Sequence, residues 1–352
     1  MGTAMLVAGV AAASPQETRA ALDQALPGLL VDAKVASVSI AEIEDGKVVL
    51  TAAYGEQSPG VKATPTTLYN VASLTKPITA EVVLRLASQH TVSLDAPMAD
   101  YWTDPDIAGD DRRLKLTARL ALSHQTGFPN WRGHDKPLAF TFTPGTAYGY
   151  SGEGYEYVAR YVEKKTGKDF EGLAQAVLFK PAGMNDTASG HPSWFDGRIA
   201  VPTDAQGRAM EPSFTVHYNA ADMLYTTAGD YARFMASAMK DQDLAAMVAQ
   251  DRRRIQVSLM DDMCQGAKAA SCPPRAGFGL GWQVLEFQGE TVMMHTGKDE
   301  GVATFAWYSP TSRRGAVVLT NSDNGFNIVI PVFEKLNASP AFLAFLRGQV
   351  GG

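Results

Sequence analysis

The stretch "LYNVASLTKPITAEVVLRL", residues 68–86, marks the point where the sequence changes from one repeating pattern to another. Beyond it the apolar residues recur at helical spacing, and Pro77 is tolerated only in the first turn of a helix. A helix is therefore expected to begin close to Ser73 and Lys76, which then share one helix face, one turn apart. A lysine on the buried side of a helix start is costly unless something compensates its charge. The pair is therefore the first candidate for chemistry.

Before this stretch the chain has the patterns of one helix and two strands. Residues 15–30, "PQETRAALDQALPGLL", carry apolar positions at helical spacing. The runs "VASVSIAEI" (35–43) and "KVVLTAAYG" (47–55) are joined by "EDG". Because Asp-Gly between alternating apolar runs is typical of a hairpin turn, we expect a pair of antiparallel strands here.

After this stretch the helical spacing continues from Leu74 to about Thr187, and strand patterns return only late in the chain. These late strands are "GLGWQVLEF" (279–287), "ETVMMHTG" (290–297), "ATFAWYSP" (303–310) and "RGAVVLTNSD" (314–323), followed by helical spacing over 328–348. The order predicts an α/β fold of the α+β type, with an antiparallel sheet built from N- and C-terminal strands and flanked by helices. We expect residues 14–75 and 205–352 to form the sheet domain and 76–204 an all-helical inserted domain, with a pocket at the seam.

Composition argues against nucleic-acid binding and against a membrane span. The chain has 352 residues, 45% of them hydrophobic, and a formal net charge of −6, as expected for a globular protein without a nucleic-acid surface. No run is long enough for a membrane span. Residues 1–13 resemble the remnant of an export signal, although no basic residue precedes Arg19, and a helical arm is the alternative. Export predicts a periplasmic or secreted protein; the oligomeric state stays open.

Two cysteines, Cys264 and Cys272, lie in the loop-like segment "MCQGAKAASCPP". They form either a short disulfide-closed loop, which suits an oxidising compartment, or two free thiols. No histidine or acidic pattern surrounds them, so we expect neither a zinc site nor another metal or cofactor.

Three separate elements carry groups suited to acyl transfer. Ser73 is a poor nucleophile until a base removes its proton, and a desolvated Lys76 amine can be that base. Tyr150 follows the turn at "TPG" (143–145) and can shuttle a proton if nearby cations lower its pKa. The run His295-Thr296-Gly297 ends a strand where a ligand can approach closely. Taken singly, each has a plain structural alternative: an N-cap serine with a surface lysine, a packing tyrosine and a common tripeptide.

Together, the order of these elements resembles the serine β-lactamase and penicillin-binding-protein superfamily, with its S-x-x-K, Tyr and K-T-G elements. The chain looks most like the class C β-lactamase branch, which includes DD-peptidases, D-aminopeptidases and esterases. Similar stretches are "LALSHQTGFP" (120–129), "PGTAYGYSGEGYEYVARYVEKKTG" (144–167), "VLFKPAGMNDT" (177–187), "MLYTTAGDYARFM" (223–235) and "GFGLGW" (277–282). The likeness extends from about residue 17 to 335.

The resemblance implies a role for each matching residue. Ser73 looks like the acylated nucleophile, Lys76 its proton acceptor and Tyr150 the group that protonates the leaving group and activates water. In this family two backbone N–H groups, that of the nucleophile and one near Asp299, bind the oxyanion. The substrate-binding side is expected to include His295, Thr296, Gly297, Gly152 and Asn219.

Two positions depart from the β-lactamase pattern. Gly152 stands where Tyr-x-Asn has the asparagine that binds the acylamino group, and His295 stands where Lys-Thr-Gly has lysine. A histidine carries a full charge only part of the time near neutral pH. We therefore expect a serine hydrolase that forms an acyl-enzyme on an ester or a D-amino-acid peptide-like amide. An efficient β-lactamase, or a penicillin-binding sensor that stays acylated, is the alternative.

Other residues near these motifs each allow two interpretations, one structural and one functional. His124 is expected to be structural, bonding backbone carbonyls at a helix end, rather than a general base. Asn219, in "VHYNAADM" (216–223), lines the substrate side together with His217 and Tyr218, or belongs to a surface loop. The aromatic residues that form either a pocket wall or core are Phe128, Trp131 and Phe140.

Overall fold

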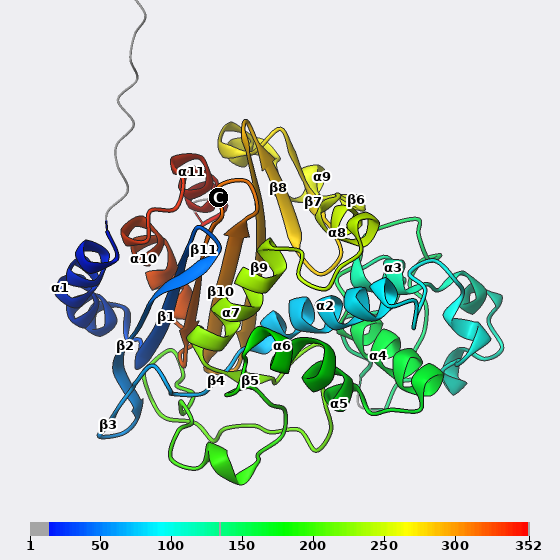
Figure 1. Cartoon of the computed structure of the whole chain (residues 1–352), viewed down its shortest axis with the longest axis horizontal. Helices are drawn as coiled ribbons and strands as arrows, with labels where there is room; N and C mark the ends of the chain where they lie inside the picture. Colours follow the sequence, from blue (N-terminus) through cyan, green and yellow to red (C-terminus); the bar gives the residue numbers. More distant parts are fainter. Residues whose placement is uncertain (1–13, 134, 351–352) are drawn as a thin grey trace, which may run out of the picture.

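A nine-stranded antiparallel sheet forms the centre of the protein. The computed structural model describes residues 14–133 and 135–350, and its strand order is β3-β2-β1-β11-β10-β9-β8-β7-β6. The strands are β1 (Ser37–Glu44), β2 (Lys47–Ser58), β3 (Val61–Lys62), β6 (Val257–Ser258), β7 (Arg275–Phe278), β8 (Gln283–Phe287), β9 (Glu290–Asp299), β10 (Val302–Ser309) and β11 (Arg314–Thr320). Because β1 pairs with β11, strands from both ends of the chain meet in one sheet, as predicted (Figure 1).

The hairpin between β1 and β2 has the predicted turn. Glu44 pairs with Lys47, which leaves Asp45 and Gly46 as the two loop residues. Their φ angles are 51° and 67°, and a two-residue turn of this kind requires positive φ at both positions. Glycine, and to a lesser degree aspartate, tolerates that backbone conformation.

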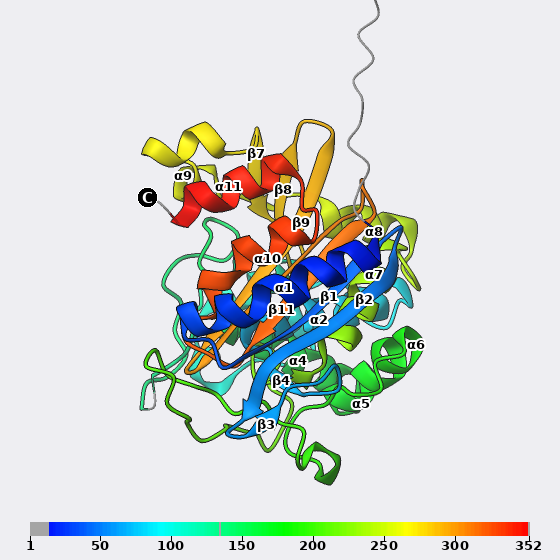
Figure 2. The ribbon, with the colours of Figure 1, turned by 90° about the vertical axis from the view of Figure 1, so that its left-hand side faces the viewer.

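Three helices cover one face of the sheet: α1 (Pro15–Ala33), α10 (Val329–Lys335) and α11 (Pro340–Val350) (Figure 2). Their apolar side chains pack against alternate residues of the central strands, including Ile40 and Val318, in one hydrophobic cluster. A capping box between Ser14 and Glu17 closes the start of α1, since each side chain binds the other residue's backbone N–H. The predicted first helix is therefore confirmed.

The opposite face of the sheet carries α2 (Thr75–Ser88) and α7 (Ala228–Met239), and further helices extend the molecule beyond α2 (Figure 1). Every residue of α2 from Thr75 to Leu86 is buried, which makes it a central helix between the sheet side and the helical side. Thr75 is its first residue, in agreement with the start expected from Pro77. The remaining helices and the small sheet of β4 and β5 are α3 (Ala118–Leu122), α4 (Gly152–Thr166), α5 (Phe170–Ala174), α6 (Lys180–Ala182), α8 (Ala246–Arg253), α9 (Met260–Met263), β4 (Tyr69–Asn70) and β5 (Tyr225–Thr226).

The fold class is therefore confirmed as mixed α/β with a large antiparallel sheet, whereas the predicted domain boundaries stay a prediction. Cys264 and Cys272 form a disulfide, which decides between the two alternatives left by the sequence. The predicted signal remnant, residues 1–13, lies outside the described residues. Over residues 14–133 and 135–350, no helix combines the length and the apolar character needed to cross a bilayer.

Candidate active site

A strained turn holds Ser73 at the start of α2. Ser73 is the middle residue of the 3₁₀ turn η1 (Ala72–Leu74), and Ala72 has a φ of 48°, a conformation that is unfavourable for residues other than glycine. The Asn70 side-chain oxygen accepts the Ala72 N–H at 2.8 Å, and the Thr75 hydroxyl donates to the Ala72 carbonyl at 2.8 Å. These bonds fix the turn, and they leave Ser73 partly exposed between buried neighbours.

Lys76 is buried and points at Ser73. Its side-chain nitrogen Nζ lies 3.0 Å from Ser73 Oγ and donates a second hydrogen bond to the Ala221 carbonyl at 2.9 Å, with only 1% of the residue exposed. Burial lowers the pKa of the Lys76 ammonium to about 8, and the nearby carboxyl groups of Asp222 and Glu156 oppose that shift. A lysine in this state is available as a base near neutral pH.

The Tyr150 ring lies beside the same ammonium group. Lys76 Nζ is 4.8 Å from the Tyr150 ring centre, so the three residues predicted to act together do converge. The sequence suggested that cations would lower the tyrosine's pKa; instead, burial raises it above its ordinary value, with a hydrogen bond to Ser73 acting in the other direction. Tyr150 therefore keeps its proton at neutral pH, and it can pass that proton on only while it receives another.

His124 supports Tyr150 from behind. The two ring centres are 4.4 Å apart, and His124 Nδ1 accepts the Ser151 backbone N–H at 3.0 Å. The residue is fully buried, and burial holds the pKa of its ring well below its usual range. A neutral, packed imidazole fits the expected structural role, but its backbone partner is an N–H group rather than the expected carbonyl.

The side chains of the triplet in β9 divide between the two faces of the sheet. His295 is buried near Tyr150, with 6.3 Å between ring centres, and its Nδ1 pairs with the Thr296 carbonyl at 2.7 Å. Burial, with the Lys76 charge as a second cause, lowers the pKa of His295 to about 3, so the ring is neutral. The Thr296 side chain instead lines an apolar cavity of about 360 Å³ on the α11 side, together with Met294 and Phe345. The expected contact between the Thr296 side chain and a substrate at Ser73 is therefore not supported.

Gly297 brings β9 against the serine turn. A Cβ atom built on Gly297 would lie 2.5 Å from the Val71 carbonyl oxygen and 3.1 Å from the Ala72 Cβ, so only glycine allows this approach. Among the described strands, β8 pairs with β9 only as far as Met294, so residues 295–299 have one strand neighbour, β10. This segment offers a free strand edge beside Ser73, where backbone N–H groups can meet an oxyanion or a substrate.

Gly152 lies next to Tyr150, whereas Asn219 makes its contact within its own loop. Gly152 begins α4 next to Tyr150, and its N–H donates to Asn130, both to the side-chain oxygen at 3.0 Å and to the carbonyl at 2.9 Å. The Trp131 ring lies over it. The Asn219 side-chain oxygen accepts the Ala221 N–H at 2.9 Å, a contact within its own loop. Asn219 thus supports the loop that provides a carbonyl to Lys76, and its role with substrate stays a prediction.

The sequence reasoning missed two acidic residues that act on Lys76. Burial raises the pKa of Asp222 to about 6 and that of Glu156 to about 7. Glu156 lies on α4 and accepts the Ala220 N–H at 2.6 Å, next to the Ala221 carbonyl that binds Lys76. Asp222 follows in the same loop as Ala221. A signal was present in "NAAD" (219–222), where an acid interrupts a small apolar run, but only the fold shows that it faces Lys76.

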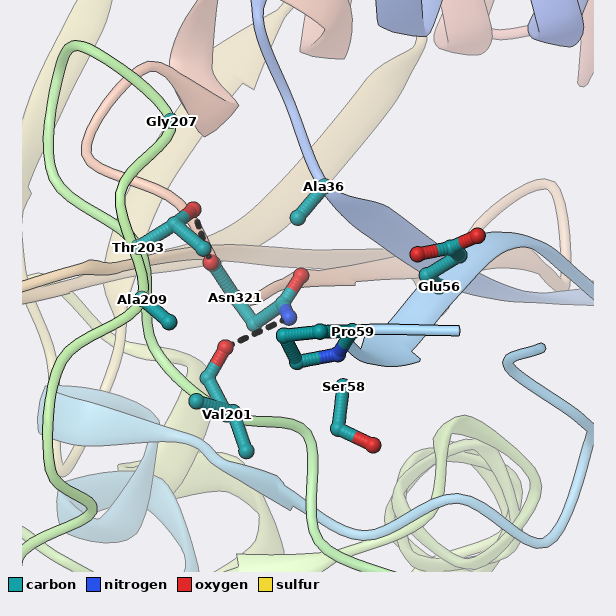
Figure 3. A pocket seen from close by; sticks show the side chains of 9 residues that line it. All are labelled: Ala36, Glu56, Ser58, Pro59, Val201, Thr203, Gly207, Ala209 and Asn321. Atoms are coloured by element: carbon teal, nitrogen blue, oxygen red, sulfur yellow. Dashed lines mark hydrogen bonds between the residues drawn. The ribbon is translucent and has the colours of Figure 1, made fainter. Parts of the chain in front are cut away.

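Of the three aromatic residues predicted to form either a pocket wall or core, two belong to the core. Phe128 and Phe140 are buried and pack against each other with 4.9 Å between ring centres. Trp131 is 42% exposed, and its ring centre lies 5.9 Å from Lys76 Nζ, so it belongs to the site. A separate cavity of about 270 Å³, between Asn321, Val201 and Pro59, includes none of the predicted site residues (Figure 3).

Comparison with known proteins finds relatives and a solved structure of the same fold. The chain is 25% identical over 302 residues to "Penicillin-binding protein 4" of Amycolatopsis lactamdurans, covering 79% of this chain and 78% of that protein. It is 22% identical over 326 residues to "Protein flp" of Staphylococcus aureus (strain COL), and it spans 62% of that longer protein. A solved structure described as "A class C beta-lactamase" shares the fold with a TM-score of 0.76 at 18% identity, over 93% of this chain and 97% of that one.

The family comparison covers both ends of the sheet and the predicted site residues. The Beta-lactamase family, described as "Beta-lactamase", matches residues 21–330. That range includes the S-x-x-K pair, the tyrosine and the β9 triplet, together with the strands that carry them. The chain therefore belongs to the Beta-lactamase family.

Proposed function

We propose that the protein is a serine acyl hydrolase in which Ser73 attacks an ester or amide carbonyl and forms an acyl-enzyme that water then resolves. The observation that carries the proposal is the 3.0 Å contact between the buried Lys76 amine and the Ser73 hydroxyl. A base in hydrogen-bond reach of a nucleophile is the first geometric requirement of this chemistry. The family match supports hydrolase chemistry of this general type.

In the proposed first step, neutral Lys76 accepts the Ser73 proton while Oγ bonds to the carbonyl carbon. With a pKa of about 8, roughly a tenth of Lys76 is neutral at pH 7, against fewer than one molecule in a thousand for an ordinary lysine. Protonated Tyr150 then gives its proton to the leaving group and regains one from the Lys76 ammonium. In the second step neutral Lys76, through Tyr150, accepts a proton from the water that attacks the acyl carbonyl, and that proton passes to Ser73 Oγ as its bond to the acyl carbon breaks.

The oxyanion that forms on the carbonyl needs donors at the mouth of the site. The Ser73 N–H lies in the η1 turn, and the free edge of β9 lies against that turn at Gly297. Two backbone N–H groups at this junction would stabilise the transition state by about 3 kcal/mol each. The hydrogen bonds of Asn70 and Thr75 hold the strained Ala72 turn before substrate arrives, so the donors need no rearrangement.

The substrate side favours a neutral ester or amide over one that carries a carboxylate. His295 stands at the lysine position of K-T-G and is neutral, because it is buried beside the Lys76 charge. The nearest lysine on β9, Lys298, is paired with Asp323. Asp299, at the end of the free edge, adds a negative charge that raises the pKa of Asp222. A substrate carboxylate at the end of the free edge would meet repulsion from Asp299, and the neutral His295 would add no cation to offset it.

The test is a pre-steady-state burst on p-nitrophenyl acetate, followed by mass spectrometry of the quenched protein. We expect an acetyl adduct on Ser73 that disappears with turnover, a loss of about 10²–10⁴ in rate for Lys76→Ala and Tyr150→Phe, and no burst for Ser73→Ala. Ser193→Ala, at an exposed serine remote from the site, is the matched control. A burst retained in Ser73→Ala would contradict the proposal, and an adduct that persists would identify a sensor rather than a hydrolase.

A panel of substrates then tests the preference. Neutral p-nitrophenyl esters and D-amino-acid amides should be turned over faster than nitrocefin, a β-lactam that carries a carboxylate. Turnover of nitrocefin as fast as that of the esters would refute the electrostatic argument from His295 and Asp299, while leaving the roles of Ser73 and Lys76 intact.

A further inference from the structure

Gly152 stands where Tyr-x-Asn has an asparagine, and an aromatic ring fills the space of the missing side chain. A Cβ atom built on Gly152 would lie 2.7 and 2.8 Å from two ring atoms of Trp131 and 2.9 Å from the Asn130 carbonyl oxygen. Contacts this short require a neighbour to move, and neither an indole ring nor a backbone oxygen is the end of a flexible chain. The missing side chain and the tryptophan are therefore two parts of one arrangement.

The Trp131 ring also faces the reacting groups. Its centre is 5.9 Å from Lys76 Nζ, which in turn is 3.0 Å from Ser73 Oγ. With 42% of the residue exposed, one part of the ring covers Gly152 while another part is open to an incoming molecule. An acyl group attached to Ser73 would therefore be within reach of the indole.

The acceptor oxygens of Asn130 and Glu153, which flank the Trp131 ring, are already engaged. The Asn130 side-chain oxygen and carbonyl accept the backbone N–H of Gly152, and the carbonyl also accepts that of Glu153 at 3.0 Å. The Glu153 carboxylate accepts two hydrogen bonds from Arg132, one from the Arg132 backbone N–H at 2.9 Å and one from the Arg132 Nε at 3.0 Å. These bonds fix the start of α4 and the loop before Trp131. The Trp131 ring therefore takes the place of a polar side chain on the side that would hold an acylamino group.

We propose that Trp131 is a specificity-determining residue that selects substrates with an apolar acyl group and disfavours those with an amide next to the scissile carbonyl. The inference rests on the proposed function. An amide placed against the indole would lose its hydration without gaining a partner, which is the condition under which a buried polar group costs most. An alkyl or aryl-alkyl chain in the same place gains contact with the ring.

Two p-nitrophenyl esters of nearly equal length test this directly: 4-phenylbutanoate and N-benzoylglycinate, in which an amide replaces two methylene groups. The leaving group is the same, and each kcat/KM is divided by the rate of hydroxide hydrolysis to remove the difference in intrinsic reactivity. We expect wild type to favour 4-phenylbutanoate at least about tenfold, as an unpaired amide predicts. Trp131→Ala should reduce that ratio at least about fivefold, while Trp194→Ala, at another partly exposed tryptophan, should leave it unchanged.

A stability measurement tests the packing without using activity. Gly152→Asn should lower the melting temperature in the wild-type background and lower it less in the Trp131→Ala background, because the clash is with the indole. Equal losses in both backgrounds, or an unchanged ester ratio in a folded and active Trp131→Ala enzyme, would overturn the inference and leave the proposed function standing. A wild-type enzyme inactive on both esters and on p-nitrophenyl acetate would overturn the proposed function, and this inference with it.

Discussion

The proton on Lys76 should control the pH dependence of acylation. With a pKa of about 8, neutral Lys76 rises from roughly a tenth of the enzyme at pH 7 to roughly nine tenths at pH 9. If the neutral amine is the base, kcat/KM on p-nitrophenyl acetate should increase about tenfold across that range and then level off. An ordinary surface lysine would place the same rise more than two pH units higher.

The decisive perturbation is Asp222→Asn. The Asp222 carboxylate is the larger of the two nearby charges that favour the protonated form of Lys76, and Glu156 is the second. Removing it takes away roughly 1 kcal/mol of attraction, which corresponds to about 0.7 pH units. The alkaline rise should therefore move to lower pH, and the rate near pH 7 should increase about three- to fivefold. Asp222 ionises with a pKa of about 6, so its charge is present throughout the measured rise.

The assay follows burst-phase acetylation from about pH 6 to pH 10 in wild type, Asp222→Asn and Glu156→Gln. The exposed Asp32 supplies the matched control, because Asp32→Asn removes the same charge far from α2. We expect Glu156→Gln to move the profile in the same direction by a smaller amount. A profile that moves to higher pH in Asp222→Asn, or that coincides with the Asp32→Asn profile, would refute the assignment of Lys76 as the titrating base.

Three further predictions concern stability. Lys76→Met should abolish the burst and raise the free energy of unfolding by about 3 kcal/mol at pH 7 in urea titrations. The folded pKa of about 8 lies below the unfolded value, so this gain should shrink as the pH rises from 8 towards 10.5, and a constant gain would contradict the cause. Replacing Cys264 and Cys272 by serine opens a short loop and should cost about 2 kcal/mol, measured against the oxidised protein. Gly297→Ala, whose Cβ would lie 2.2 Å from the Thr304 hydroxyl, should lower the melting temperature and the burst rate together; loss of the burst at an unchanged melting temperature would place the effect in the chemistry alone.

Much of the architecture could be predicted from the sequence because local patterns determine it. The Asp45-Gly46 turn specifies a hairpin, and the late strand patterns had to join that hairpin to complete a sheet. The placement of Ser73 and Lys76 followed from Pro77, which allows a helix only if it begins nearby. The hairpin and the helix start depend on neighbours in the chain, whereas the joining of the two ends of the chain followed from the order of the strand and helix patterns.

The electrostatics of the site could not be predicted in the same way. Asp222 and Glu156 are far from Lys76 in sequence, and only the packing of α4 and the 219–222 loop around α2 brings them together. Likewise, the sequence shows only that Gly152 lacks the side chain of an asparagine, and the structure is needed to show that Trp131 occupies that space. In each case the side chain that lies at the site is one that the family motifs do not contain.

The position of Thr296 differs from the expectation for a reason that strand geometry supplies. Side chains on a strand alternate between its two faces, so three consecutive residues cannot all point to one side. Gly297 faces the serine turn and His295 faces Tyr150, which assigns Thr296 to the α11 side, where its cavity lies. The triplet therefore supplies one packed imidazole, one close backbone approach and one residue that faces away from Ser73. In the proposed mechanism β9 would then contribute mainly through its backbone edge, while the neutral His295 packs near Tyr150 without adding a charge.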